Sequence, residues 1–196
     1  MTEQESLMII TQMIHNAKKE QKDNGAGWIL WGWLLFSASI LTFINQIYQW
    51  FSTYFFWNLF GIASLVLLLY NIIQALFLKR TASVKTYTGD LFQKLNLGFF
   101  ISLMLIIVAI NKGVSPIYGF ALMLSLYGFW ILVYGTALNF KPSVIGAYFV
   151  WACALGAMFV TSFRYTMLIH AIAILGGYII PGHLARIEFN KTQKTN

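Results

Sequence analysis

Six long apolar segments, separated by shorter polar ones, dominate the chain from Gly25 onwards. A helix needs about 20 residues, at 1.5 Å each, to cross the hydrocarbon layer of a bilayer, and most of these segments are near or above that length. We therefore predict an all-α membrane bundle of six transmembrane helices, at residues 25–47, 54–78, 91–110, 114–138, 143–163 and 165–180. Because only the polar segment 79–90 is longer than a brief turn, neighbouring helices are expected to form antiparallel hairpins.

The two ends of the chain differ from this central domain, residues 25–183. Residues 1–24 place Leu7, Ile10 and Ile14 on one helical face, while lysines make the other face polar. This pattern predicts an amphipathic helix that lies in the membrane interface or docks on a partner. Residues 184–196 are expected to form a basic cytoplasmic tail that contacts anionic lipid.

The positions of the basic residues predict the orientation in the membrane. With the N-terminus inside, eleven of the thirteen lysines and arginines fall on the cytoplasmic side, and only Lys112 and Arg164 fall outside. Cytoplasmic loops of membrane proteins carry this excess of positive charge. An even number of spans then places both termini in the cytoplasm, as expected for a multi-pass protein of a bacterial inner membrane.

Composition supports a membrane protein and argues against a soluble domain and against a nucleic-acid-binding protein. Hydrophobic residues make up 59% of the chain and charged residues only 10%, whereas soluble domains carry about 25% charged residues. The net charge of +7 lies at the ends of apolar segments, which favours contact with anionic lipid rather than nucleic acid. The single cysteine, Cys153, excludes an internal disulfide and a cysteine-based metal cluster.

Catalytic patterns are missing from the sequence. There is no Gly-x-Ser-x-Gly, His-Glu-x-x-His or Cys-x-x-Cys motif, and no close pair of acidic residues at a helix end could hold a divalent cation. A haem held by two histidines is not expected, because His15 and His183 lie on the opposite side of the membrane from His170. We therefore predict a non-enzymatic protein without a metal or cofactor.

His170 is the leading candidate for a functional side chain. It lies about five residues into the sixth apolar segment, and an ionisable residue inside a membrane helix marks a functional site by default. One reading is that it handles a proton or a ligand. The other is that its imidazole simply hydrogen-bonds a serine, a threonine or a carbonyl on a neighbouring helix.

A second group of candidate residues lies toward the cytoplasmic side. Asn71 and Gln74 share a helical face, and Asn96 is near the start of the next helix. Carboxamides at this depth either bond between helices or line a small vestibule. Trp33, deeper than the aromatic belt, is read either as an interfacial anchor or as the wall of a lipid or ligand groove.

Small residues and a proline define packing positions and a candidate hinge. Glycine and alanine spaced by four let helix backbones approach closely in lipid. The packing positions predicted in this way are Gly128, Gly135, Ala152, Gly156, Ala173 and Gly177, with the last two segments joined as a tight hairpin. Because Pro181 clashes with the carbonyl of Gly177, the last helix is expected to kink or end there. Gly176, Gly177, Pro181 and Gly182 are therefore a candidate hinge.

Three stretches carry a resemblance to a known group: NGAGWILWGWLLFSAS, NFKPSVIGAYFVW and GYIIPGHLAR. Together they resemble uncharacterised small bacterial integral membrane proteins that cross the membrane six times. The resemblance spans Asn24 to Arg186. It implies a bacterial inner-membrane protein, and that group offers no activity or catalytic residues to carry over.

These observations favour an accessory or sensory subunit that acts through its amphipathic cytoplasmic ends. The expected partners are the lipid bilayer, with anionic lipid on the cytoplasmic side, a membrane or cytoplasmic protein, and a second copy of the chain. The alternative is a channel or transporter component for a small solute or a lipid. No Asp, Glu or Arg lies in the middle of a predicted span, which argues against an ion-driven pump.

Overall fold

The computed structural model describes residues 25–77 and 87–194, and within these ranges the chain forms helices and loops without a strand. The helices are α2 (Ala26–Tyr48), α3 (Phe55–Phe77), α4 (Tyr87–Asn111), α5 (Pro116–Ala137), α6 (Lys141–Met158), α7 (Phe163–Ile174), a π-helical turn η1 (Leu175–Ile179) and α8 (Ile180–Lys194). The predicted all-helical architecture is confirmed. The amphipathic helix expected in residues 1–24 lies outside the described residues.

The helices have the length and composition of membrane spans. Within residues 25–77 and 87–194, five stretches are long and apolar enough to cross a bilayer: Ala26–Tyr48, Phe92–Asn111, Pro116–Ala137, Lys141–Met158 and Phe163–Lys191. A shorter apolar stretch, Phe55–Leu67, belongs to α3. None of the residues Phe92–Asn111 of α4 is fully buried within the chain. Soluble proteins rarely expose so large an apolar surface. The fold is that of a multi-pass membrane protein.

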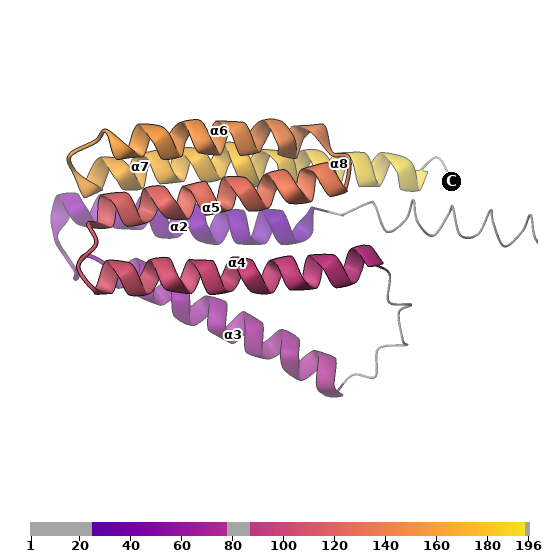
Figure 1. Ribbon diagram of the computed structural model, residues 1–196, viewed down its shortest axis with the longest axis horizontal. Coiled ribbons are helices and arrows are strands. Elements are labelled where there is room, and N and C mark those ends of the chain that lie inside the picture. Colours follow the sequence, from indigo (N-terminus) through magenta and orange to yellow (C-terminus); the bar gives the residue numbers. More distant parts are fainter. Residues whose placement is uncertain (1–24, 78–86, 195–196) are drawn as a thin grey trace, which may run out of the picture.

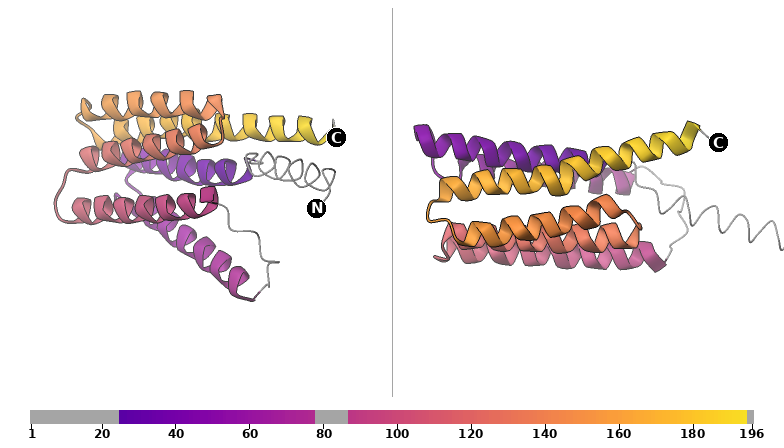
Figure 2. Two further views of the ribbon diagram at one scale, coloured as in Figure 1. Left: turned by 45° about the vertical axis from the view of Figure 1, so that its right-hand side comes forward. Right: turned by 90° about the horizontal axis from the view of Figure 1, so that it is seen from above.

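Four columns of helix form the centre of the bundle, namely α2, α5, α6 and the column α7–η1–α8. They run side by side in alternating directions (Figures 1 and 2). The closest pairs are α5 with α6 and α2 with α7. α3 packs on α2 and α4 packs on α5, but the described Cα atoms of α3 and α4 stay more than 8 Å apart. α3 diverges from the rest of the bundle along its length (Figure 1).

The hairpin of α5 and α6 is closely packed at two glycines of α5. A Cβ added to Gly128 would lie 2.7 Å from the indole ring of Trp151, and one added to Gly135 would lie 2.7 Å from the Cβ of Ser143. The indole Nε1–H of Trp151 also donates to the carbonyl of Ser125 at 2.9 Å. Glycine at these positions lets the two helices approach closely enough for this contact.

The contact between α6 and the next column uses a different face of α6 from the one expected. Ala152 and Gly156 are exposed, and a Cβ on Gly156 would meet no atom within 4 Å. Gly146 makes the close approach instead, because its Cβ would lie 3.1 Å from the carbonyl oxygen of Gly176 and 3.3 Å from the ring of Pro181. The expectation for Ala152 and Gly156 was wrong because the buried face of α6 follows Gly146 and is set by two neighbouring helices at once.

The last helix neither ends nor separates at Pro181. It passes through η1 and continues to Lys194, so most of the segment expected to be a tail is helical. In η1 the N–H of Ile180 bonds the carbonyl of Leu175, one residue further back than in an α-helix. Proline cannot donate to the carbonyl of Gly177, and a π-turn changes the local register so that the helix can absorb this loss.

The glycines around η1 also bring α2 close to the same column. A Cβ on Gly32 would lie 3.1 Å from the Cβ of Tyr178, and one on Gly182 would lie 3.0 Å from the Cβ of Trp28. Gly25 adopts a left-handed φ of 68°, and a Cβ there would collide with the carbonyl oxygen of Gly182. The candidate hinge is thus packed between α2 and α6, and a bending role for it stays a prediction.

Candidate functional site

A row of buried polar side chains joins α2 to α7. Ser39, Thr42 and Asn45 follow one another at spacings of three on α2, and Thr166 and His170 are four apart on α7. Each is at most 2% exposed. Only His170 of this group was predicted from the sequence. The regular spacing of three polar residues within an apolar segment was a signal that could have found the partners on α2.

Most of these polar groups are satisfied close by in the chain. The hydroxyl of Thr42 donates to the carbonyl of Ala38 at 2.7 Å. Asn45 holds the loop that follows α2: its Oδ1 accepts from the N–H of Phe51 at 2.9 Å, and its Nδ2 donates to the carbonyls of Phe51 and Ser52 at 3.1 and 3.2 Å. These hydrogen bonds stabilise the fold and leave few donors or acceptors of Thr42 and Asn45 available to a ligand.

Replacing Asn45 by alanine should destabilise the loop between α2 and α3. The substitution removes the partners of one N–H and two carbonyls, and each such hydrogen bond contributes about 0.5–1.5 kcal/mol net. We expect a lower melting temperature in detergent and faster proteolysis between residues 49 and 54. Gln46→Ala, at the neighbouring position, serves as the control. Equal effects of the two substitutions would contradict this role.

The imidazole of His170 is held in one tautomer by Ser39. The Oγ of Ser39 lies 2.7 Å from the carbonyl oxygen of Leu35 and 2.9 Å from the Nδ1 of His170. Because a carbonyl can only accept, the single hydroxyl proton of Ser39 is used on Leu35. The Oγ must therefore accept from Nδ1–H. In a neutral imidazole with a protonated Nδ1, the Nε2 carries a lone pair and no proton.

The Nε2 of His170 is the unusual atom of the site. It is buried and, among the described residues, is the only buried side-chain nitrogen or oxygen without a hydrogen-bond partner. Leaving a buried acceptor unpaired costs about 1–3 kcal/mol. An unpaired buried atom of this kind calls for an explanation, and binding of a polar group is one. One nitrogen of His170 is thus paired with a serine, and the other has no partner among the described residues. A role of this side chain in handling a proton or a ligand stays a prediction.

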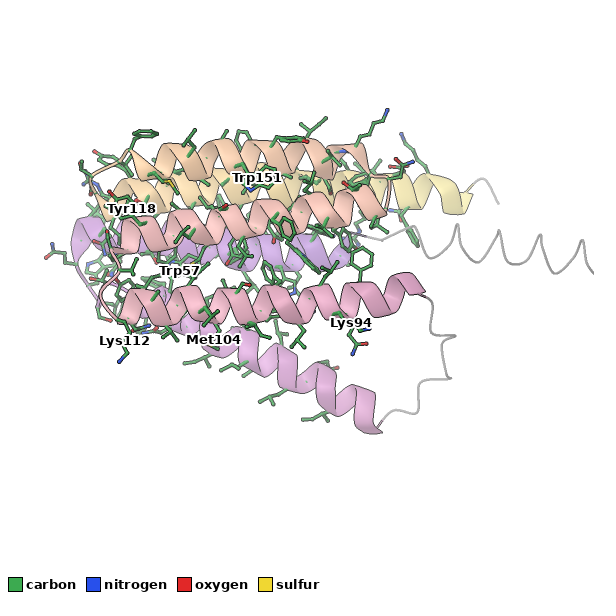
Figure 3. All side chains as sticks on the ribbon, in the orientation of Figure 1. Trp57, Lys94, Met104, Lys112, Tyr118 and Trp151 are labelled. Atoms are coloured by element: carbon green, nitrogen blue, oxygen red, sulfur yellow. The ribbon has the colours of Figure 1, made fainter. Side chains whose placement is uncertain are left out.

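Aromatic rings surround this imidazole. Trp57 of α3 meets it edge to face at 5.2 Å between ring centroids, and Phe120 and Tyr127 of α5 lie at 5.8 and 5.9 Å. The Nε1–H of Trp57 donates to the Sδ of Met167 at 3.3 Å, which orients the indole. Trp57 projects from α3 toward α5 (Figure 3) and contacts Phe120 at 4.7 Å between centroids. We call Trp57, Phe120 and Tyr127 the aromatic cage.

A line of rings continues from the cage to the π-turn. The rings of Tyr127 and Tyr178 lie 6.1 Å apart, and those of Tyr178 and Trp28 lie 4.9 Å apart. Tyr178 belongs to η1, while Trp28 is near the start of α2. Direct ring packing therefore connects the surroundings of His170 with the one irregular turn of the long C-terminal helix.

The other candidate residues are not part of this cage. Trp33 is 47% exposed and packs on Phe36 of its own helix. Asn96 is exposed on α4. Asn71 and Gln74 belong to the last turns of α3, and their side chains lie outside the described part of the chain. A vestibule formed by these residues stays a prediction.

Metal-binding groups and known relatives add no further assignment. Within residues 25–77 and 87–194, no group of three or more His, Cys, Asp or Glu side chains is placed to hold a metal ion. Comparisons with protein-family models, with curated proteins and with solved structures find no match. The geometry around His170 and the column α7–η1–α8 are therefore the features that bear on function.

Proposed function

We propose that this chain is a non-enzymatic accessory or sensory subunit of a bacterial inner membrane. One observation carries the proposal: a single helical column runs from His170, through η1, to Lys194. A change at a buried polar site can be transmitted along a continuous helix more readily than across a flexible loop. The π-turn provides a local irregularity at which the column can change its twist.

The charge distribution supports both termini on the cytoplasmic side. Lys94 lies near one end of α4 and Lys112 at the other (Figure 3). Because the helices alternate in direction, Lys141 and Arg186 belong to the Lys94 end, and Arg164 belongs to the Lys112 end. Lysines and arginines of short loops concentrate on the cytoplasmic side, so the Lys94 end is assigned to the cytoplasm.

α8 offers the surface through which a partner would be contacted. It extends past the ends of α5 and α6 (Figures 1 and 2). Leu184 and Ile187, three residues apart on this helix, are 42% and 51% exposed. His183 and Arg186 are exposed as well, so the segment combines apolar and basic side chains. An amphipathic helix of this kind lies on a headgroup layer or docks in a groove of another protein.

A photo-reactive amino acid at Ile187 tests this proposal in intact membranes. If the proposal holds, this part of α8 lies in the cytoplasm, and we expect an adduct with a second protein. The same group at Leu155, 59% exposed on the lipid-facing side of α6, should give adducts with lipid only. Absence of a protein adduct at Ile187, or equal adducts at both positions, would argue against an accessory role. An adduct of twice the chain mass would identify a second copy as the partner.

A channel or transporter component stays the alternative hypothesis. Solute flux into proteoliposomes, measured for the wild type and for His170→Ala, distinguishes the two functions.

A further inference from the structure

We propose that the Nε2 of His170 binds a lipid-soluble phenol or hydroquinone by accepting the hydrogen bond of its ring hydroxyl. The inference deepens the sensory function proposed above, since it names the chemical class of the signal. It depends on three features of the site. The Nε2 of His170 can only accept a hydrogen bond, aromatic rings surround the imidazole, and the helix α3 covers these rings.

The first feature is that Nε2 can only accept. The proton of the Ser39 hydroxyl is used on the carbonyl of Leu35, so the imidazole proton lies on Nδ1. An incoming group must therefore bring an O–H or an N–H. A ketone, an ester or a quinone offers only acceptor atoms and would leave Nε2 unpaired.

The second feature is the aromatic cage around the ring. Trp57, Phe120 and Tyr127 approach the imidazole with interplanar angles of 73–90°, so their edges and faces enclose it on several sides. A flat aromatic guest can make offset or edge-to-face contacts with such rings. A ligand site of this kind is mostly apolar, and one well-placed polar atom orients the guest.

The third feature is that the cage is covered from a peripheral helix. Trp57 lies on α3, whose backbone comes close to α2 alone among the described helices and which diverges from the bundle (Figure 1). Tyr127 and Phe120 belong to the central helix α5, and both are 3% exposed. If α3 moved outward with Trp57, the cage would open toward lipid, while Phe120 and Tyr127 would stay in place on α5. A guest that enters this way must be soluble in the bilayer.

These features together predict discrimination between two redox states of one molecule. A hydroquinone and its quinone have nearly the same shape, but the hydroquinone donates hydrogen bonds and the quinone only accepts them. The site should prefer the hydroquinone. Contact between Tyr127 and Tyr178 then links the occupied cage to η1 and so to α8.

Binding to the full-length protein in nanodiscs tests the inference, with tetramethylhydroquinone and tetramethyl-1,4-benzoquinone as a matched pair under anaerobic conditions. We expect the hydroquinone to bind at least about tenfold more tightly by calorimetry, which corresponds to about 1.4 kcal/mol. Nitrogen NMR of the labelled histidine should show a shift of Nε2 on binding. His170→Phe should lose the preference while keeping the shape of the ring.

Two variants of α2 make the assignment specific. Ser39→Ala removes the acceptor for Nδ1–H, so the other tautomer becomes available and the preference should fall toward unity. Thr42→Ala, which alters a hydroxyl bonded to its own helix, should keep the preference. Equal binding of the two probes by the wild type, binding of neither probe, or a preference that survives in both His170→Phe and Ser39→Ala would overturn the inference. The adduct at Ile187 is measured without either probe, so the proposed function and this inference can fail independently.

Discussion

Replacing Gly177 by leucine is expected to lower the stability of the bundle strongly. A Cβ at this position would collide with the side chain of Val150 and lie 3.1 Å from the Cδ1 of Ile131, both of which belong to buried residues. Overpacking a close-packed interior costs about 1–3 kcal/mol and sometimes more, and a whole leucine side chain lies at the upper end. We expect the melting temperature to fall by at least about 6 °C, because each kcal/mol lowers it by about 2–4 °C in chains of 150–250 residues.

The matched control for this substitution is Gly156→Leu. Both changes replace a helical glycine by leucine and gain about the same intrinsic helix propensity, which is 0.8–1.0 kcal/mol for glycine against alanine. Gly156, however, has no atom within 4 Å of an added Cβ. The control should therefore fold and melt at or above the wild-type temperature. Size-exclusion chromatography after heating in detergent measures both proteins, and similar melting of the two would refute the close approach of α6 and η1.

Replacing Tyr127 by alanine should have the second large effect. This side chain is 3% exposed and contacts His170, Tyr178 and the ring of Phe99 on α4. Removing a large aromatic side chain from a core costs about 3–5 kcal/mol, because its dispersion contacts disappear and a cavity remains. The expected decrease in melting temperature is roughly 6–20 °C.

Two further variants separate the contributions of Tyr127. Tyr118→Ala, on the same helix but at a position 54% exposed, should change the melting temperature little. Tyr127→Phe keeps the ring and removes only the hydroxyl, so it should retain most of the stability. If Tyr127→Ala melted like Tyr118→Ala, the column of rings between His170 and η1 would not be a structural element of the bundle.

The existence and approximate limits of most helices could be predicted from the pattern of apolar residues. Lipid offers no hydrogen bonds to the backbone, so a chain that crosses it must form helices that are internally bonded and apolar on their surface. The segment 114–138 corresponds to α5 at Pro116–Ala137, and 25–47 corresponds to α2 at Ala26–Tyr48. The last segment was predicted too short because a proline normally interrupts a helix, whereas η1 lets this one continue.

The candidate site could be predicted only in part. His170 stands out in the sequence because ionisable residues are rare in apolar segments. Its partner Ser39 is 131 residues away along the chain, and several other serines and threonines were equally available. The residues of the aromatic cage could not be predicted for a related reason. Aromatic residues are numerous in this chain, at 17%, and nothing in their spacing shows which rings meet.

The sequence by itself determined that this is an all-helical, multi-pass chain with one histidine inside an apolar segment, because those properties depend on local composition and on the solvent. The tertiary structure alone decided which faces of the helices meet. In lipid nearly every face is apolar, so the choice between Gly146 and Gly156 depends on the fit of whole surfaces rather than on hydrophobicity. The same fit brought Ser39 to His170 and left Nε2 without a partner.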